Sequence, residues 1–313
     1  MRKKSILCVG ELLWDLLPTG PALGGAPFNV AYRVNQTGGR GRIATRLGQD
    51  DLGRRAAEAV EGKGLELDLL QWDLEKPTGT VPVTLDAKGS PDFEIRKDVA
   101  YDRLEAAPAL LAAASTADAI VYGSLITRTP GAREALGKVL DAGKGALKFC
   151  DLNLRKGCYT PETVRDCVER ADILKLNEGE ARELAEMFGI PAQTGRTLIG
   201  LLAKGAKLDA VVVTLGAKGV VAQRGDQWLF APAFETEVVD TCGSGDAFSA
   251  GFLRATLEKW PLNQCCRWGN AFGAMVAGQA GATEPLPEDW SDRGNRMQPA
   301  PGSWDEDLAY WIS

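Results

Sequence analysis

The residues best suited to carry out chemistry lie in the segment TEVVDTCGSGDAFSAGF, residues 236–252. The pattern predicts a strand that ends near Val239, a glycine-rich turn at residues 243–245 and a helix of small residues after Asp246. The unpaired N–H groups and positive dipole end of a helix N-terminus favour a phosphate group. A carboxylate there would repel a phosphate unless it had a task, such as taking a proton from an attacking alcohol. Asp246 is therefore a candidate general base, although the motif alone fits equally well a plain loop with Asp246 as the helix cap.

A second cluster of polar residues lies near the N-terminus. Gly24 and Gly25 directly precede a predicted helix that contains Asn29. Asp15, preceded by Trp14, lies shortly before the two glycines. A carboxylate and a carboxamide beside a close backbone approach can bind vicinal hydroxyls, and an indole can cover the apolar face of a sugar. Taken singly, Asn29 is equally a helix cap and Trp14 a core residue.

The composition excludes several classes of chemistry. The 313 residues contain no histidine, which removes Ser-His-Asp and Cys-His catalysis, imidazole bases and histidine-ligated metals. No G-x-x-x-x-G-K-[ST] sequence is present, so a Walker-type NTPase is disfavoured. The net charge of −6, without a block of Lys or Arg, argues against a nucleic-acid partner. No apolar run approaches the roughly 20 residues of a membrane span, and the cysteines, without a C-x-x-C pair, indicate reduced thiols in a cytoplasmic protein.

The elements that must position these residues alternate along the chain. Short β-branched runs separated by Ala- and Leu-rich stretches predict β-α-β units and a mostly parallel sheet covered on both faces. The predicted strands of this sheet are 6–9, 119–122, 147–151, 173–176 and 210–214, and the predicted helices include 53–63, 131–142, 178–188 and 195–204. Strand-like segments without helices between them, notably 79–86 and 91–96, predict a smaller sheet. We therefore expect an α/β core from residues 1–10, 26–76 and 103–313, and a β lid from residues 11–25 and 77–102.

Together, the two polar clusters resemble the signatures of the ribokinase-like (PfkB) carbohydrate kinase family. The first signature extends from Gly24 to Gly48 and the second from Asp240 to Gly251, in the family's order. Three intermediate elements also match the family pattern: Asp151-x-Asn153-x-Arg155, Asn177-x-x-Glu180 and Thr214-Leu215-Gly216-x-x-Gly219. The resemblance covers the chain up to about residue 287. Leu152 stands where many members have proline, and Ser244 where alanine is commoner.

The resemblance implies a three-layer α/β/α core with a small β-sheet lid, and an ATP-dependent transfer of the γ-phosphoryl group to a sugar hydroxyl. Asp246 would be the general base. The amides of Gly243, Ser244 and Gly245 would form the anion hole for the transferring phosphoryl group.

The resemblance also assigns binding roles to the other residues. Sugar contacts would come from Asp15, Gly24, Gly25 and Asn29, with Arg155 neutralising ligand charge, and nucleotide contacts from Asn177, Thr214, Gly216, Gly219 and Asn270. Glu180 would lie near the Mg²⁺ that accompanies ATP, acting through water. Asp240, with carbonyls around residues 281–282, resembles a monovalent-cation site for K⁺. Taken alone, Glu180 is a solvated carboxylate on a helix face, and Arg155 is equally a surface salt bridge.

The segments 10–15, 23–31 and 93–102 look most like those of fructokinase-like members, so the expected reaction is D-fructose to fructose 6-phosphate. A 2-keto-3-deoxygluconate kinase is the nearest alternative, with Arg33, Arg96 or Arg155 available for a substrate carboxylate. Ribose and adenosine kinases rank lower. A catalytically silent sensor of sugar or nucleotide would have lost the base or an anion-hole glycine, and both are present. A homodimer through the lid is a further expectation, and residues 288–313 carry no predicted function.

Overall fold

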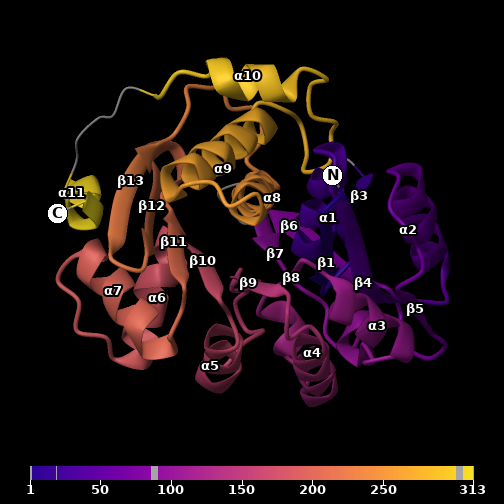
Figure 1. Ribbon diagram of the computed structural model, residues 1–313. Helices are drawn as coiled ribbons and strands as arrows, with labels where there is room; N and C mark the ends of the chain where they lie inside the picture. The colour runs from indigo at the N-terminus through magenta and orange to yellow at the C-terminus, as the bar shows by residue number, and fades with distance from the viewer. Residues whose placement is uncertain (1, 19, 86–90, 301–305, 313) are drawn as a thin grey trace.

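A nine-stranded, mostly parallel sheet forms the centre of the computed structural model, which describes residues 2–18, 20–85, 91–300 and 306–312 (Figure 1). The strand order is β13-β12-β11-β10-β9-β8-β1-β4-β5. The strands are β1 (Ser5–Val9), β4 (Arg40–Gly48), β5 (Leu70–Asp73), β8 (Ala119–Tyr122), β9 (Leu147–Asp151), β10 (Ile173–Asn177), β11 (Ala210–Thr214), β12 (Gly219–Arg224) and β13 (Gln227–Pro232). The pairs of β12 with β11 and β13 are antiparallel, and the other pairs are parallel.

Helices cover both faces of this sheet because neighbouring strand residues point to opposite sides and both sides are apolar. Ile6 and Cys8 of β1 belong to one buried cluster, whereas Leu7 and Val9 belong to the other. The first face is covered by α1 (Ala26–Gln36), α2 (Asp51–Gly62), α8 (Ser244–Leu257), α9 (Leu262–Ala277) and α10 (Trp290–Arg296). The second face is covered by α3 (Pro108–Thr116), α4 (Pro130–Ala142), α5 (Pro161–Glu169), α6 (Glu178–Phe188), α7 (Gly195–Ala206) and α11 (Glu306–Ile312). The result is the predicted three-layer α/β/α core.

The sequence pattern locates most elements to within two residues. The strands at 119–122, 147–151 and 210–214 and the helix at 178–188 agree at both ends. The strand predicted to end near Val239 is wrong: β13 ends at Pro232, and the chain then runs irregularly to α8. Val238 and Val239 are 58% and 60% exposed, so their β-branched side chains do not mark a buried strand here.

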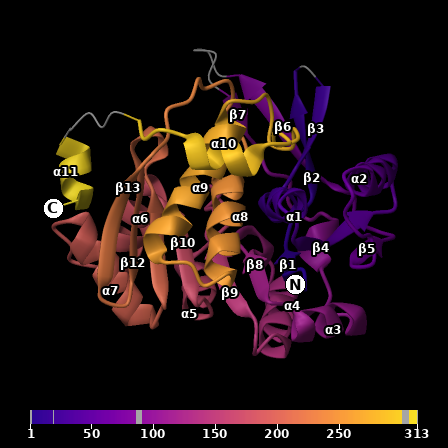
Figure 2. The same cartoon turned by 45° about the horizontal axis from the view of Figure 1, so that its top comes forward.

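A second sheet of order β3-β2-β6-β7 stands beside the core (Figure 2). Its strands are β2 (Leu13–Leu17), β3 (Gly20–Gly24), β6 (Gly79–Leu85) and β7 (Pro91–Phe93). They come from the two segments expected to form a lid, 11–25 and 77–102, of which residues 19 and 86–90 lie outside the described part. The segment predicted as a strand over 91–96 ends at Phe93. Strand β2 follows β1 after a short connection, so this sheet begins at the carboxyl edge of the central sheet.

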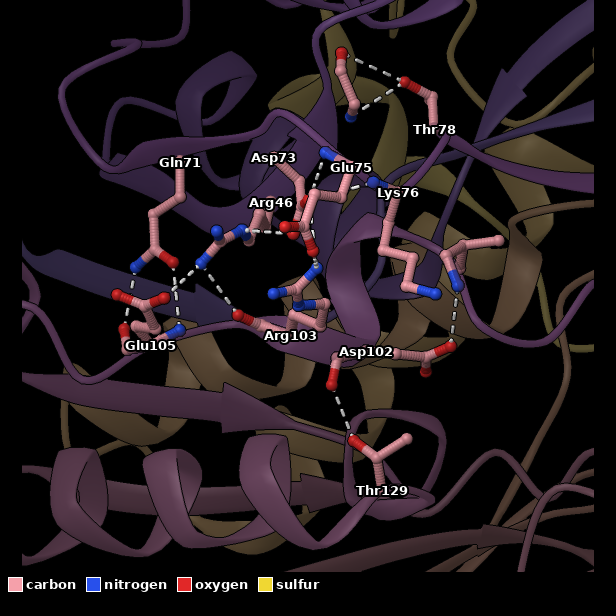
Figure 3. Close-up of polar contacts among 12 residues, drawn as sticks. Arg46, Gln71, Asp73, Glu75, Lys76, Thr78, Asp102, Arg103, Glu105 and Thr129 are labelled. Carbon is pink, nitrogen blue, oxygen red and sulfur yellow. Dashed lines mark hydrogen bonds and ion pairs between the residues drawn. The ribbon is translucent and has the colours of Figure 1, made fainter.

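A polar junction joins the two sheets where the chain leaves β5 for β6 (Figure 3). One carboxylate oxygen of Asp73 accepts the backbone N–H groups of Glu75 and Lys76, each at 2.9 Å. Its other oxygen pairs with Arg46 Nε at 2.9 Å, and Arg103 pairs with Glu75 at 2.7 Å. Asp73 is 1% exposed, so these partners offset the cost of a buried charge and fix the entry into β6.

Three short 3-10 helices, η1 (Ala100–Arg103), η2 (Leu125–Thr127) and η3 (Gly216–Lys218), complete the connections. Across the residues that the structure describes, no helix combines the length and apolar character needed to cross a membrane.

Candidate active site

The N-terminus of α8 lies where several strands of the central sheet end, the usual position of ligands in open α/β sheets. Helix α8 begins at Ser244, and Gly243 before it has a φ of 73°, a conformation that favours glycine. A Cβ atom on Gly243 would lie 2.6 Å from the Cβ atom of Ala282. Both the backbone conformation and the neighbouring loop therefore require a glycine at this position.

Two of the three amides predicted to form the anion hole are available to a ligand. The N–H groups of Gly243 and Gly245 donate no hydrogen bond to any residue that the structure describes. The Ser244 N–H instead donates to the Thr241 carbonyl at 3.2 Å. Ser244 Oγ is buried and has no hydrogen-bond partner in the same described part of the chain. The turn thus carries the unsatisfied donors that bind anions at helix N-termini.

Asp246 lies in the first turn of α8 and meets the N-terminal cluster. Asn29 Nδ2 of α1 donates to Asp246 Oδ2 at 2.7 Å, while Asn29 Oδ1 is buried without a described partner. Burial raises the pKa of Asp246 to about 6, the negative charge of Asp151 adds to this, and the Asn29 hydrogen bond, Lys175 and Arg155 oppose it. A carboxylate with that pKa is ionised at neutral pH and is a stronger base than an ordinary aspartate.

A buried ion pair lies directly beneath the glycine-rich turn. Lys175 Nζ of β10 lies 2.9 and 3.1 Å from the two carboxylate oxygens of Asp151, the last residue of β9. Ser249 Oγ of α8 donates to Asp151 Oδ2 at 2.7 Å, which ties the helix to the strand. A Cβ atom on Gly245 would lie 3.2 Å from Lys175 Nζ, so the ammonium is next to the turn.

Lys175 remains a cation in this buried position. Burial alone would lower the pKa of Lys175, but the carboxylates of Asp151, Glu180 and Asp246 together raise it above its ordinary value. No motif in the sequence marks Lys175. The signal was present as one lysine within an otherwise apolar strand, ILKLN, in a sheet whose strands are buried on both faces.

Three residues expected to contact a sugar, Asp15, Gly24 and Gly25, lie in or directly after the paired strands β2 and β3. Asp15 lies in β2, paired with Ala22 of β3, and a Cβ atom on Gly24 would lie 2.8 Å from Asp15 Oδ2. Burial raises the pKa of Asp15, and the positive charge of Arg155 opposes the shift. Arg155 is exposed but forms no salt bridge with the described residues, so the salt-bridge alternative considered for it is not observed.

Glu11 is a further acidic residue of this region that sequence analysis did not identify. Gly25, at the N-cap of α1, has a φ of 121°, and a Cβ atom there would lie 2.4 Å from the Glu11 carbonyl. Glu11 Oε1 accepts the Ala26 N–H at 3.2 Å, and burial raises the pKa of Glu11 to about 7. A pocket at the ends of β1, β8 and β9 is lined by Glu11, Pro27, Ser124, Asp151, Asn153 and Arg155, among others.

Asn177 and Glu180 form a reciprocal cap on α6. Asn177 Oδ1 accepts the Glu180 N–H at 2.9 Å, and Glu180 Oε2 accepts the Asn177 N–H at 2.8 Å. Glu180 Oε1 accepts the Leu154 N–H at 2.8 Å. Glu180 is 6% exposed, so it is not a solvated helix-face carboxylate, and burial raises its pKa. Because both oxygens already accept backbone N–H groups, Glu180 is suited to meet a metal ion through water.

The other expected nucleotide residues lie around β11 and β12. Thr214 ends β11 and donates to the Leu176 carbonyl at 3.2 Å, while Gly216 and Gly219 flank the turn into β12. Asn270 of α9 is 8% exposed. Its Nδ2 donates to the carbonyls of Ala231 and Pro232 at 3.1 and 2.8 Å. The Asn270 amide thus holds β13 against α9, a structural task in addition to the expected one.

The residues expected around a monovalent cation are engaged with protein groups. Asp240 accepts the N–H groups of Cys242 and Gly281, both at 2.9 Å. The Ala282 carbonyl accepts Arg33 Nη2 at 2.6 Å. No group of three or more acidic or cysteine side chains in the described part of the chain could hold a metal ion. Asp240 and the Ala282 carbonyl therefore already have protein donors as partners.

The chain is similar to known proteins over most of its length. Residues 19–289 match the model of the pfkB family carbohydrate kinases. A probable fructokinase-3 of Arabidopsis thaliana is 30% identical over 92% of this chain and 90% of its own. A 2-dehydro-3-deoxygalactonokinase of Haloferax volcanii is 30% identical over 80% of each chain.

Solved structures share the fold over nearly the whole chain. The fructokinase of Xylella fastidiosa with bound ATP superposes with a TM-score of 0.83 at 23% identity, over 93% of this chain and 98% of its own. A double-mutant fructokinase of Vibrio cholerae O395 in a fructose-, ADP- and potassium-bound form superposes with a TM-score of 0.78 at 24% identity, over 91% of this chain and 95% of its own.

A doubly covered parallel sheet with a small second sheet, and a helix N-terminus that presents an aspartate beside free amides, define a ribokinase-like kinase. The chain belongs to the pfkB family of carbohydrate kinases and is an ATP-dependent sugar kinase of that family.

Proposed function

We propose that this kinase transfers the γ-phosphoryl group of ATP to D-fructose to give fructose 6-phosphate, with Asp246 as general base. The observation that carries the proposal is the position of Asp246. It lies between the free amides of the α8 turn and Asn29 of the N-terminal cluster, at 2.7 Å from Asn29 Nδ2. A group placed between an anion site and a hydroxyl-binding site can take the proton of an attacking alcohol.

The proposed reaction follows from this placement. Asp246 accepts the proton of the sugar hydroxyl as its oxygen attacks the γ-phosphorus, and the bond between that phosphorus and the bridging oxygen of ADP breaks. The N–H groups of Gly243 and Gly245 donate to the oxygens of the transferring group. The Lys175 ammonium beneath the turn adds positive charge where negative charge accumulates, while Asp151 keeps it in place.

A magnesium ion bound with ATP would neutralise charge on the phosphates. Glu180 is the carboxylate that would lie near this ion and would meet it through water. Solved relatives carry ATP, or ADP with potassium or calcium, which supports a nucleotide and a metal as ligands of this fold.

Several observations support a hexose as the acceptor. The relatives that cover most of this chain include fructokinases of plants, and a fructokinase of the same fold binds fructose. Asp15, Asn29 and the close backbone at Gly25 provide acceptors and donors for hydroxyls on one side of Asp246.

A 2-keto-3-deoxy sugar acid is the second candidate. The Haloferax volcanii relative phosphorylates a substrate of this kind by its name, and Arg155 lines the pocket without an ion-pair partner among the described residues. Arg33 is unavailable for a substrate carboxylate because it is buried and bonded to backbone carbonyls. Arg155→Ala should therefore leave fructose turnover largely intact and abolish turnover of a keto acid.

A coupled ADP-release assay tests the proposal with fructose, ribose, adenosine and 2-keto-3-deoxygluconate, followed by identification of the product by NMR. We expect fructose to give the highest kcat/KM and a product phosphorylated at O6. A higher kcat/KM for 2-keto-3-deoxygluconate than for fructose would make the keto sugar acid, the second candidate, the substrate of this kinase. Binding of ATP without turnover of any of these acceptors would favour a silent sensor.

We also propose a homodimer through the small sheet. Leu16 and Leu17 of β2 are each 37% exposed, so this sheet presents apolar surface near the site. Light scattering coupled to gel filtration would give the mass of a dimer, and Leu16→Lys should return it to a monomer.

A further inference from the structure

Arg33 of α1 is enclosed completely, with 0% of its surface exposed. We infer that the Arg33 guanidinium is a built-in cation for the loop of residues 281–284, so that ATP binding and turnover require no potassium or sodium ion. The part of this inference that concerns turnover rests on the proposed kinase function. The part that concerns the loop and ATP binding rests on the contacts of Arg33.

Cationic side chains bind three consecutive carbonyls of this loop. Arg33 Nη2 donates to the Ala282 carbonyl and Arg33 Nη1 to the Glu284 carbonyl, both at 2.6 Å. Between them, the Thr283 carbonyl accepts Lys63 Nζ of the α2 C-terminus at 2.9 Å. Carbonyl oxygens that converge on a positive charge are also what binds an alkali cation, and here protein groups supply the charge.

The loop held by Arg33 supports the phosphate-binding turn. Gly281 N–H donates to Asp240 at 2.9 Å, and the other Asp240 oxygen accepts the Cys242 N–H. Ala282 packs against Gly243, the residue before α8, because a Cβ atom there would lie 2.6 Å from the Ala282 Cβ. A change in the position of the loop would therefore move the amides at the start of α8.

The same helix serves the base and the loop. Asn29 and Arg33 are separated by one helical turn of α1 and lie on the same face, so both point toward the α8 end of the site. Asn29 bonds to Asp246, and Arg33 bonds to the carbonyls behind the turn. One helix thus positions the general base and the loop behind the anion-binding amides.

Arg33 is charged at physiological pH. Burial lowers the pKa of Arg33 to about 10, and Tyr32, Asp246 and Glu284 oppose that shift. The guanidinium is therefore protonated at pH 7. A second cation on the Ala282 and Glu284 carbonyls would meet a like charge in a buried place, where repulsion is strong. This explains why the residues expected to bind K⁺ do not form an open site.

The first experiment uses the unaltered protein and compares equal concentrations of potassium chloride and tetramethylammonium chloride. Calorimetric titration of ATP with magnesium and the thermal midpoint are measured in both salts. We expect both to be the same in the two salts, with ATP affinity agreeing within about twofold. A loss of ATP affinity or a marked fall in the midpoint on removal of potassium would overturn the inference, whether or not any sugar is phosphorylated.

The second experiment removes the guanidinium. Arg33→Ala should weaken ATP binding by roughly tenfold or more, because the loop loses its cation and the turn loses its support. Arg254→Ala is the matched control, since Arg254 of α8 also donates to a backbone carbonyl, that of Thr37, but away from the loop. ATP affinity of Arg33→Ala equal to that of the unaltered protein would contradict the inference. If Arg33→Ala does not fold, the salt comparison still decides it.

Discussion

At the scale of single residues, the site places the base directly after the glycine-rich turn, since Asp246 follows Gly245 in the chain. Asp246 must be ionised to accept a proton, and burial raises the pKa of Asp246 to about 6. We therefore expect kcat/KM to fall about tenfold per pH unit below pH 6 and to level off above it, since this parameter reports the free enzyme.

Asp246→Asn removes the base but retains a side chain of the same shape. We expect kcat to fall by about 10² to 10⁴, with ATP affinity largely unchanged and the acid limb of the pH profile lost. Steady-state kinetics over pH 5 to 9 measure kcat and the pH profile, and calorimetric titration measures the ATP affinity. A variant that keeps its turnover and its acid limb would show that another group takes the proton.

Lys175 acts on Asp246 through charge. The groups that face Asp246 are Asn29, Asp151, Lys175, Arg155, Glu11 and Arg33 together with the thiols of Cys8 and Cys242. Lys175→Met removes the cation and leaves Asp151 buried without it. We expect the acid limb of kcat/KM to move to higher pH, and the double variant Lys175→Met/Asp151→Asn to move it back. An unmoved limb in the single variant, with kcat lowered, would assign Lys175 a purely structural role.

At the scale of elements, the turn before α8 depends on a glycine that no other residue replaces well. Gly243→Ala forces a side chain into the left-handed region, at a cost of about 1–2 kcal/mol, and against Ala282. We expect Gly243→Ala to lower the thermal midpoint. We also expect it to weaken ATP binding, because the amides at the start of α8 would shift. Gly205→Ala is the matched control, because Gly205 lies in α7 with open space around it and alanine there should raise the midpoint. Equal behaviour of the two variants would contradict this account.

The elements that the sequence predicts best have a continuous apolar run or a clearly marked end. Strand β11, with AVVVT, and helix α6, with its Asn177 cap, carry signals strong enough to fix both ends. The segment around Val239 misled because β-branched residues also occur in exposed loops. The spacing of glycines with Asp246 predicts a phosphate-binding turn. The contacts of Lys175, Glu11 and Arg33 could not be predicted, because they come from burial and from partners distant in sequence.

At the scale of the whole molecule, the site costs stability. Glu11 is 7% exposed, and burial raises the pKa of Glu11 to about 7 from an ordinary value of 4.5. The folded protein holds this proton more tightly than the unfolded chain, so stability from Glu11 is complete below pH 4.5 and is lost as the pH rises through about 7. The difference corresponds to about 3 kcal/mol.

Glu11→Gln keeps the acceptor for the Ala26 N–H but cannot ionise. We expect Glu11→Gln to exceed the unaltered protein in thermal midpoint at pH 8 by several degrees and to match it at pH 5. Glu58→Gln, at an exposed position of α2, is the control and should behave alike at both pH values. Calorimetry at the two pH values makes the comparison. If Glu11→Gln is less stable than the unaltered protein at pH 8, the Glu11 carboxylate is paired and stabilising there. The burial of Glu11 would then not cost the folded protein stability.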